Sequence, residues 1–198
     1  MSCIKEATSI ITDASVVEEI HEGIRLVVFV LYDPTKHKDD FIQLNIEYIG
    51  WIAEQVLTRY GIKFGETMGM TVEEYILSQY EKYTSIPQED GKLLILEEAE
   101  QVIGMGAITR YSEDVGEIQR MYIKPEYRGR GWGKQMLKKL IDVAKEIEYT
   151  ALRLDTGGFM DTAKYVYTSV GFREISEYAE SEVPIPLRHH WFFMELEL

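Results

Sequence analysis

A glycine-rich segment with interleaved cations stands between a predicted strand and a predicted helix, and it reads Arg128-Gly129-Arg130-Gly131-Trp132-Gly133-Lys134. Residues without a Cβ let the backbone approach a ligand closely and adopt positive φ. The first N–H groups of the following helix point at such a ligand, and the helix dipole adds partial positive charge. Together with the three cationic side chains, these features predict a site for a pyrophosphate group.

Two common phosphate-binding motifs do not fit this segment. A nucleotide P-loop has four residues between its glycines and Ser or Thr after its Lys. Here three residues separate Gly129 from Gly133, and Gln135 follows Lys134. A dinucleotide fingerprint has the spacing G-x-G-x-x-G early in a parallel βαβ unit, whereas the spacing here is G-x-G-x-G and several elements precede it. A glycine-rich turn that holds no ligand stays open as an alternative.

The charge distribution also indicates an anion site. The formal net charge is −13, yet seven of the 21 Lys and Arg residues fall within residues 120–139. An acidic protein with one basic island is expected to bind a compact anion there. The overall acidity disfavours nucleic acid and anionic lipid as partners and favours cationic solutes such as amines.

Other features of the composition limit the class of protein. The single cysteine, Cys3, excludes an internal disulfide and a cysteine-based metal site, which fits a cytoplasmic location. The longest apolar run, residues 26–32, is far shorter than the roughly 20 residues of a membrane helix. His189 and His190 are neighbours in a predicted strand and face opposite ways, so no metal is expected.

Hydrophobic periodicity predicts the elements that position the glycine-rich segment. Strands are predicted over residues 24–32, 93–97, 102–109, 117–123, 151–155 and 188–198. Helices are predicted over residues 41–60, 71–83, 134–147 and 161–170, the second of them starting at a capping box on Thr71. This order predicts an α/β (α+β) fold with a mixed, mostly antiparallel sheet flanked by helices.

At this point the chain resembles the GNAT superfamily of acyl-CoA N-acyltransferases. The signature of that family is Gln or Arg, two residues, Gly, one residue, then Gly or Ala, which residues 128–133 match. Residues 120–127 look like the preceding strand and turn of the family, and residues 154–156 and 166–172 look like its later strand and helix. Met160 departs from the pattern, because many members have Asn there.

The resemblance implies a GNAT-like sheet whose central strands splay apart to admit the pantetheine arm of acetyl-CoA, the expected co-substrate. Met121, Tyr122 and Ile123 match the strand whose backbone pairs with that arm. Arg128, Gly129, Arg130, Gly131, Trp132, Gly133 and Lys134 match the pyrophosphate loop. Residues 1–20 are interpreted as an N-terminal lead-in and residues 21–198 as a single N-acetyltransferase domain.

The resemblance also implies direct transfer of an acetyl group to a primary amine. An alkyl amine with a pKa near 10.4 is about three units from its neutral form at pH 7, a cost of roughly 4–5 kcal/mol, so a base is useful. Glu117 is the candidate base, on a strand face that alternation assigns to Glu117, Gln119 and Met121. Tyr167 matches the residue that stabilises the leaving thiolate.

The expected acceptor is a small-molecule or peptide amine, and the acidic composition allows a cationic one. The first two helices usually form the wall of the acceptor pocket in this family, which places Glu47, Tyr48 and Trp51 there as ligands for a cation. A catalytically inactive acyl-CoA-binding sensor or structural protein is the alternative function. The terminal strand could pair across a homodimer.

Overall fold

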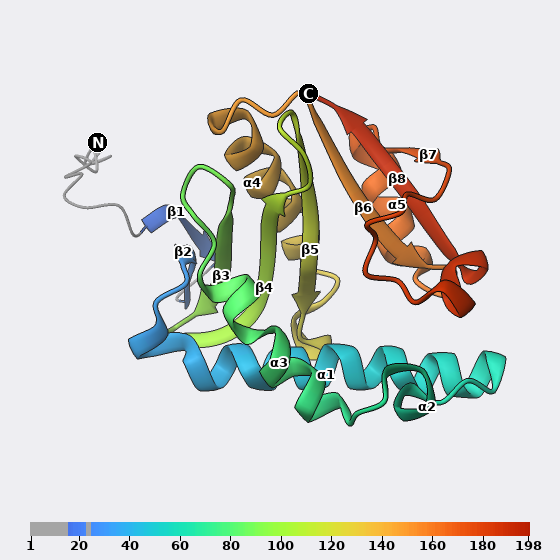
Figure 1. The fold of residues 1–198 in the computed structure, drawn as a ribbon. Coiled ribbons are helices and arrows are strands. Elements are labelled where there is room, and N and C mark those ends of the chain that lie inside the picture. The colour runs from blue at the N-terminus through green and yellow to red at the C-terminus, as the bar shows by residue number, and fades with distance from the viewer. Residues whose placement is uncertain (1–15, 23–24) are drawn as a thin grey trace, which may run out of the picture.

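An eight-stranded sheet forms the centre of the molecule, with its strands in the order β1-β2-β3-β4-β5-β6-β8-β7 (Figure 1). The computed structural model describes residues 16–22 and 25–198. Its strands are β1 (Val16–Glu22), β2 (Arg25–Leu31), β3 (Lys92–Glu98), β4 (Gln101–Arg110), β5 (Val115–Ile123), β6 (Ala151–Gly157), β7 (Arg173–Ile175) and β8 (Trp191–Glu197). All neighbouring strands pair antiparallel except β5 and β6, which are parallel. The predicted mixed, mostly antiparallel sheet is confirmed.

Helices cover both faces of this sheet. They are α1 (Pro34–Tyr60), α2 (Phe64–Met68), α3 (Val72–Thr84), α4 (Trp132–Glu146) and α5 (Asp161–Val170). Alternate residues of β3 show the two layers, since Leu94 and Leu96 pack in the core under α4 whereas Leu93 and Ile95 pack in the core under α1 and α3. A strand buried on both faces is apolar at successive positions, which explains why β3 lacks the polar alternation of a half-exposed strand.

The first long helix starts earlier than the sequence pattern predicts. Its N-cap is Asp33, whose carboxylate accepts a hydrogen bond from the Thr35 N–H at 2.8 Å, and Pro34 occupies the first turn. Residues 36–40 are polar and charged, so apolar periodicity alone placed the start at residue 41. The predicted capping box of α3 is confirmed, with Thr71 and Glu74 exchanging hydrogen bonds.

The sheet separates at its middle. Strands β5 and β6 pair only at residues 115–117 and 151–153, and beyond this point they diverge (Figure 1). Over residues 118–123 the β5 edge that faces β6 therefore has no strand partner within the described chain. This is the splayed arrangement expected from the resemblance.

A β-bulge in β5 corrects the predicted face of Met121. The register between β4 and β5 shifts between Met105 and Ala107, and opposite this shift Arg120 has a φ of 55°. One extra residue reverses the alternation of every later side chain. Met121 accordingly packs against the core under α4, on the opposite face from Gln119.

Several predicted boundaries also need correction. Helix α4 begins at Trp132 and not at residue 134, and β8 begins at Trp191 because residues 185–190 form a 3-10 helix. Strands β1 and β7 and helix α2 were not predicted, and β1 begins within the segment interpreted as a lead-in. Residues 1–15, which make up most of that segment, lie outside the described residues. Residues 23–24 lie outside them too, and residue 24 is the start of the first predicted strand. The domain boundary stays a prediction.

Strand β8 lies inside the sheet, between β6 and β7, and is not an edge strand. A dimer through the terminal strand would therefore have to involve β7 as well, and the homodimer stays a prediction. Within the described chain, no helix combines the length and apolar character needed to cross a membrane.

Candidate functional site

The glycine-rich segment forms a loop whose backbone donors are available to a ligand. Gly129 and Gly131 have φ values of 80° and 85°, and α4 begins directly after Gly131. No described residue accepts a hydrogen bond from the N–H groups of residues 129–134. A Cβ added at Gly129, Gly131 or Gly133 would meet nothing within 4 Å. The loop therefore presents a row of free donors and open space, as a pyrophosphate requires.

The three cationic side chains of the loop differ in how much of their positive charge is compensated by protein carboxylates. The Arg128 Nε donates to the carbonyl oxygen of Ile123 at 2.9 Å, which directs its guanidinium, and Lys134 is exposed. No described carboxylate lies within ion-pair distance of either. Arg130 in contrast has its Nη1 3.2 Å from Glu98 Oε1, so part of its charge is compensated. Trp132 is buried in the core, and only its backbone faces the loop.

The predicted strand segment before the loop combines packed side chains with a free backbone edge. Ile123 packs under α4, while Tyr122 packs on the other face, with its ring centroid 5.3 Å from that of Tyr48. Met121 lines a cavity between the two halves of the sheet. Because β6 does not pair with this stretch, its backbone can hydrogen-bond to an extended ligand.

The cavity lies where β5 and β6 diverge and has a volume of about 160 Å³. Helix α1 contributes one wall, β5 and β6 contribute the floor, and the loop before β8 contributes another wall. Its polar lining residues include Tyr48, Gln119, Arg120, Asp155 and Tyr167. Of the three residues predicted to bind the acceptor, only Tyr48 lines the cavity.

The other two predicted acceptor residues lie outside the cavity lining. Glu47 pairs with Gln43 along the surface of α1, with 3.2 Å between Gln43 Nε2 and Glu47 Oε1. Trp51 packs edge-on against Phe159, with ring centroids 5.7 Å apart. Glu47 and Trp51 are four residues apart and share one side of α1, next to the side whose residues Tyr48 and Ile52 line the cavity. No cluster of metal-ligating side chains is present in the described part of the chain.

Two carboxylates occupy the start of the split. Glu117 is buried, accepts a hydrogen bond from the Tyr178 hydroxyl at 2.7 Å and is also bonded to Gln119. Burial raises the pKa of Glu117. Asp155 lines the cavity, and burial together with the charge of Glu117 raises the pKa of Asp155 to about 7. The cavity therefore contains a carboxyl group that exchanges its proton near neutral pH.

Tyr167 is buried in α5 and faces the same cavity. Its hydroxyl has no hydrogen-bond partner among the described residues. Burial raises the pKa of Tyr167, and Tyr48 and Asp155 raise it further by their charge. The phenol is thus a neutral donor directed at whatever occupies the cavity.

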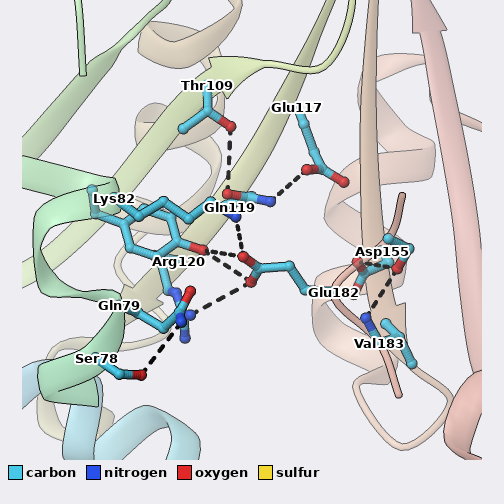
Figure 2. A network of polar contacts seen from close by, with 12 residues as sticks. Ser78, Gln79, Lys82, Thr109, Glu117, Gln119, Arg120, Asp155, Glu182 and Val183 are labelled. Carbon is cyan, nitrogen blue, oxygen red and sulfur yellow. Dashed lines mark hydrogen bonds and ion pairs between the residues drawn. The ribbon is translucent and has the colours of Figure 1, made fainter. Parts of the chain in front are cut away.

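Arg120 and Glu182, which line the cavity, belong to a polar network that also includes Lys82 (Figure 2). Glu182, in the loop before β8, accepts hydrogen bonds from the Tyr83 hydroxyl at 2.9 and 3.0 Å and pairs with Lys82. The Arg120 Nη2 lies 3.1 Å from the Tyr75 hydroxyl and 3.5 Å from Glu182 Oε2. The guanidinium also stacks on the Tyr83 ring, 4.6 Å from its centroid. These contacts join α3 and β5 to the C-terminal half of the sheet.

The comparisons with known proteins agree with this geometry. A family model described as Acetyltransferase (GNAT) family matches residues 63–172, more than half of the chain. The chain belongs to the GNAT acetyltransferase family. An uncharacterized N-acetyltransferase of Escherichia coli strain K12, YjgM, is 30% identical over 130 residues, which cover 64% of this GNAT chain and 75% of that protein.

Solved structures place this GNAT chain in the same fold. An acetyltransferase from Streptococcus agalactiae superposes with a TM-score of 0.64 at 20% identity, covering 87% of this chain and 98% of the other. The PaiA N-acetyltransferase of Thermoplasma acidophilum, solved in complex with coenzyme A, superposes with a TM-score of 0.61 at 18% identity, covering 87% and 99%. The resemblance stated from the glycine-rich motif is confirmed.

Sequence reasoning did not select three residues of the site. Asp155 was noted only as part of a family-like strand, although a carboxylate near the end of a buried strand is itself a signal. Arg120 was counted in the basic island, although a charge inside an apolar strand indicates a buried ion. Glu182 lies in a loop without periodicity, and no sequence signal identifies it.

Proposed function

We propose that this protein transfers an acetyl group from acetyl-CoA to a primary amine by direct attack. The observation that carries the proposal is the split between β5 and β6, with free loop donors at one end and Asp155 and Tyr167 in a cavity. The free N–H groups of residues 129–134, with Arg128 and Lys134, fit the pyrophosphate of coenzyme A. The coenzyme A complex of the PaiA enzyme, which has the same fold, supports this assignment.

The reaction needs the acceptor nitrogen as a neutral nucleophile. The protonated amine first gives one proton to a base, and its nitrogen then forms a bond to the thioester carbonyl carbon. The carbon–sulfur bond breaks, the sulfur takes its electron pair, and the second proton lost by the nitrogen passes to the sulfur through solvent. The products are an N-substituted acetamide, the free thiol of coenzyme A and one proton released to solvent.

Asp155 is the better-placed base and Glu117 supports it. Asp155 lines the cavity, whereas the Glu117 carboxylate is engaged by Tyr178 and Gln119 and does not. The charge of Glu117 contributes to the raised pKa of Asp155, and a base with a pKa near the working pH is the most effective. Glu117, the base predicted from the sequence, is therefore proposed as the partner that tunes Asp155.

Tyr167 is proposed to stabilise the leaving sulfur. An ordinary phenol near pKa 10 against a thiol near 8.5 already makes full proton transfer uphill by about 2 kcal/mol, and the raised pKa of buried Tyr167 makes the transfer less favourable still. A hydrogen bond that strengthens as charge builds on sulfur is sufficient. Tyr167→Phe is expected to lower turnover by roughly 10²-fold or more while acetyl-CoA affinity stays within about twofold. Unchanged turnover under conditions where chemistry limits the rate would remove Tyr167 from the mechanism.

The proposal is tested by calorimetric titration with acetyl-CoA followed by free-thiol release against a panel of amines. Micromolar binding with amine-dependent thiol release is expected. Absence of acetyl-CoA binding would overturn the proposal. A cytoplasmic location and the lack of a nucleic-acid partner stay predictions, which the net charge of −13 supports for nucleic acid.

A further inference from the structure

Arg120 is a buried cation that is only partly used by the protein. Its side chain is 4% exposed, and within the described chain only Nη2 donates to protein acceptors, the Tyr75 hydroxyl and Glu182. Among the described residues, Trp132 Nε1 is the only fully enclosed side-chain nitrogen or oxygen without a hydrogen-bond partner. The Nε and Nη1 atoms of Arg120 also lack a partner, so they are not fully enclosed. Since Arg120 lines the cavity, we take the cavity as the open space that these two atoms reach.

Glu182 does not satisfy this guanidinium. Its oxygens are engaged by the Tyr83 hydroxyl at 2.9 and 3.0 Å and by Lys82. The contact of Glu182 with Arg120 is the longest of the set, at 3.5 Å, and it is made to one nitrogen. A charged hydrogen bond is normally shorter than 3 Å. The guanidinium thus keeps its Nε and Nη1 donors, which point to different edges of the plane, and each can donate a single charged hydrogen bond to an anion.

The remaining lining of the cavity indicates the rest of the ligand. Asp155 and the Tyr48 hydroxyl provide groups for an amine, and Arg120 is near enough to lower the pKa of Asp155 by its charge. Between these polar groups the wall is apolar, with side chains from α1, α2 and the loop before β8: Ile49, Ile52, Val56, Phe64, Val183 and Leu187. At roughly 10–15 Å³ per water-sized occupant, about 160 Å³ holds on the order of ten non-hydrogen atoms.

We propose that the acceptor is a small amino acid with an apolar side chain, whose carboxylate binds Arg120 and whose amine faces Asp155. This inference rests on the proposed function, since it names the substrate of the same site. It also refines the expectation of a cationic acceptor, because the ligand is zwitterionic.

The test compares matched pairs of acceptors that differ only in the carboxylate, such as leucine and 3-methylbutylamine. Free-thiol release with acetyl-CoA gives kcat/KM for each member of a pair. We expect the carboxylate-bearing member to be favoured at least tenfold, as the loss of a charged hydrogen bond predicts. Arg120→Met should bring the ratio close to one while the KM for acetyl-CoA is unchanged, and Arg110→Met, on the surface of β4, should keep the preference.

Two further measurements keep the inference falsifiable. Because Arg120→Met leaves the partly buried Glu182 carboxylate without one of its partners, the double variant Arg120→Met with Glu182→Gln is tested alongside, with thermal unfolding as the check of folding. Binding of N-acetyl-leucine and of N-(3-methylbutyl)acetamide in the presence of coenzyme A is measured by calorimetry, which needs no turnover.

The outcomes separate the two proposals. Acetylation of decarboxylated amines as efficiently as of amino acids would overturn the inference and leave the acetyltransferase intact. A carboxylate preference that survives in a folded Arg120 variant would overturn it as well. If acetyl-CoA binds but no acceptor is acetylated, equal or absent binding of the two N-acetyl compounds overturns the inference, and Arg120-dependent binding of N-acetyl-leucine supports it.

Discussion

Replacing Asp155 by asparagine should make the protein more stable, and only above mildly acidic pH. Asp155 has a pKa of about 7 in the folded protein, against an ordinary value of 3.8. At about 1.4 kcal/mol per pKa unit, this difference corresponds to a cost of about 4 kcal/mol when the carboxyl is ionised. Asparagine cannot ionise and keeps an oxygen for the Ser181 hydroxyl, which lies 3.3 Å from Asp155 Oδ2.

The direction of the pH dependence follows from proton binding. Between pH 4 and pH 7 the folded protein holds the Asp155 proton and the unfolded chain has already released it. The unfolded state then binds fewer protons, so the free energy of unfolding falls as pH rises through this window. Below pH 4 both states are protonated and the cost disappears. The difference in the free energy of unfolding between Asp155→Asn and wild type should therefore shift by about 4 kcal/mol in favour of the variant between pH 4 and pH 8.

At pH 4 the variant should be less stable than wild type by about 2 kcal/mol, because the buried asparagine amide needs hydrogen bonds at every pH. At pH 8 the avoided ionisation cost of about 4 kcal/mol should make the variant more stable than wild type by about 2 kcal/mol. For a chain of this length that corresponds to about 4–8 °C in Tm. The assay is urea and thermal unfolding from pH 4 to pH 8, with Asp142→Asn on the exposed face of α4 as the control. The explanation for Asp155 would be refuted if the difference in free energy of unfolding between wild type and variant did not change with pH. It would also be refuted if the variant were less stable than wild type at pH 8.

Three further outcomes are expected. Gly131→Glu should abolish acetyl-CoA binding, since a side chain at φ 85° is strained and its charge opposes phosphate; near-normal affinity by calorimetry would contradict the loop assignment. His37→Ala should lower the free energy of unfolding in urea by about 2–3 kcal/mol, because it removes the 2.9 Å contact of His37 Nε2 with buried Glu97; a loss below 0.5 kcal/mol would show that the contact contributes little. Gly50→Ala should stabilise α1 by about 0.5–1 kcal/mol, as a Cβ there meets nothing within 4 Å, and a lower Tm would contradict this.

Local rules account for the elements that the sequence predicted well. The capping box at Thr71 and the glycine-rich segment before α4 depend on residues a few positions apart, so both can be recognised in the sequence before the fold is known. The hairpin of β3 and β4 was also predicted, although its turn residues Ala99 and Glu100 adopt positive φ without glycine. Apolar periodicity found the long helices but misplaced the start of α1, where a cap and a proline determine the boundary.

Long-range contacts account for most of what the sequence did not show. The bulge at Arg120 arises from the pairing of β4 with β5, and strand alternation cannot reveal it. Glu182 meets Lys82 and Tyr83 across about 100 residues of chain, from a loop with no repeating pattern. The candidate site therefore divides into a glycine-rich loop that the sequence predicts and a cavity that long-range contacts form.

The short pairing of β5 with β6 has a consequence for how this protein selects substrates. The cavity is lined from both sides of the divided sheet, with Arg120 on one side and Asp155 on the other. Helix α1 runs beneath both parts of the sheet and connects them (Figure 1). The separation of these two groups is therefore set by the opening angle of the sheet and not by either side chain. A substitution in the packed face of α1 would therefore change the distance between Arg120 and Asp155, and with it the length of a ligand that can contact both.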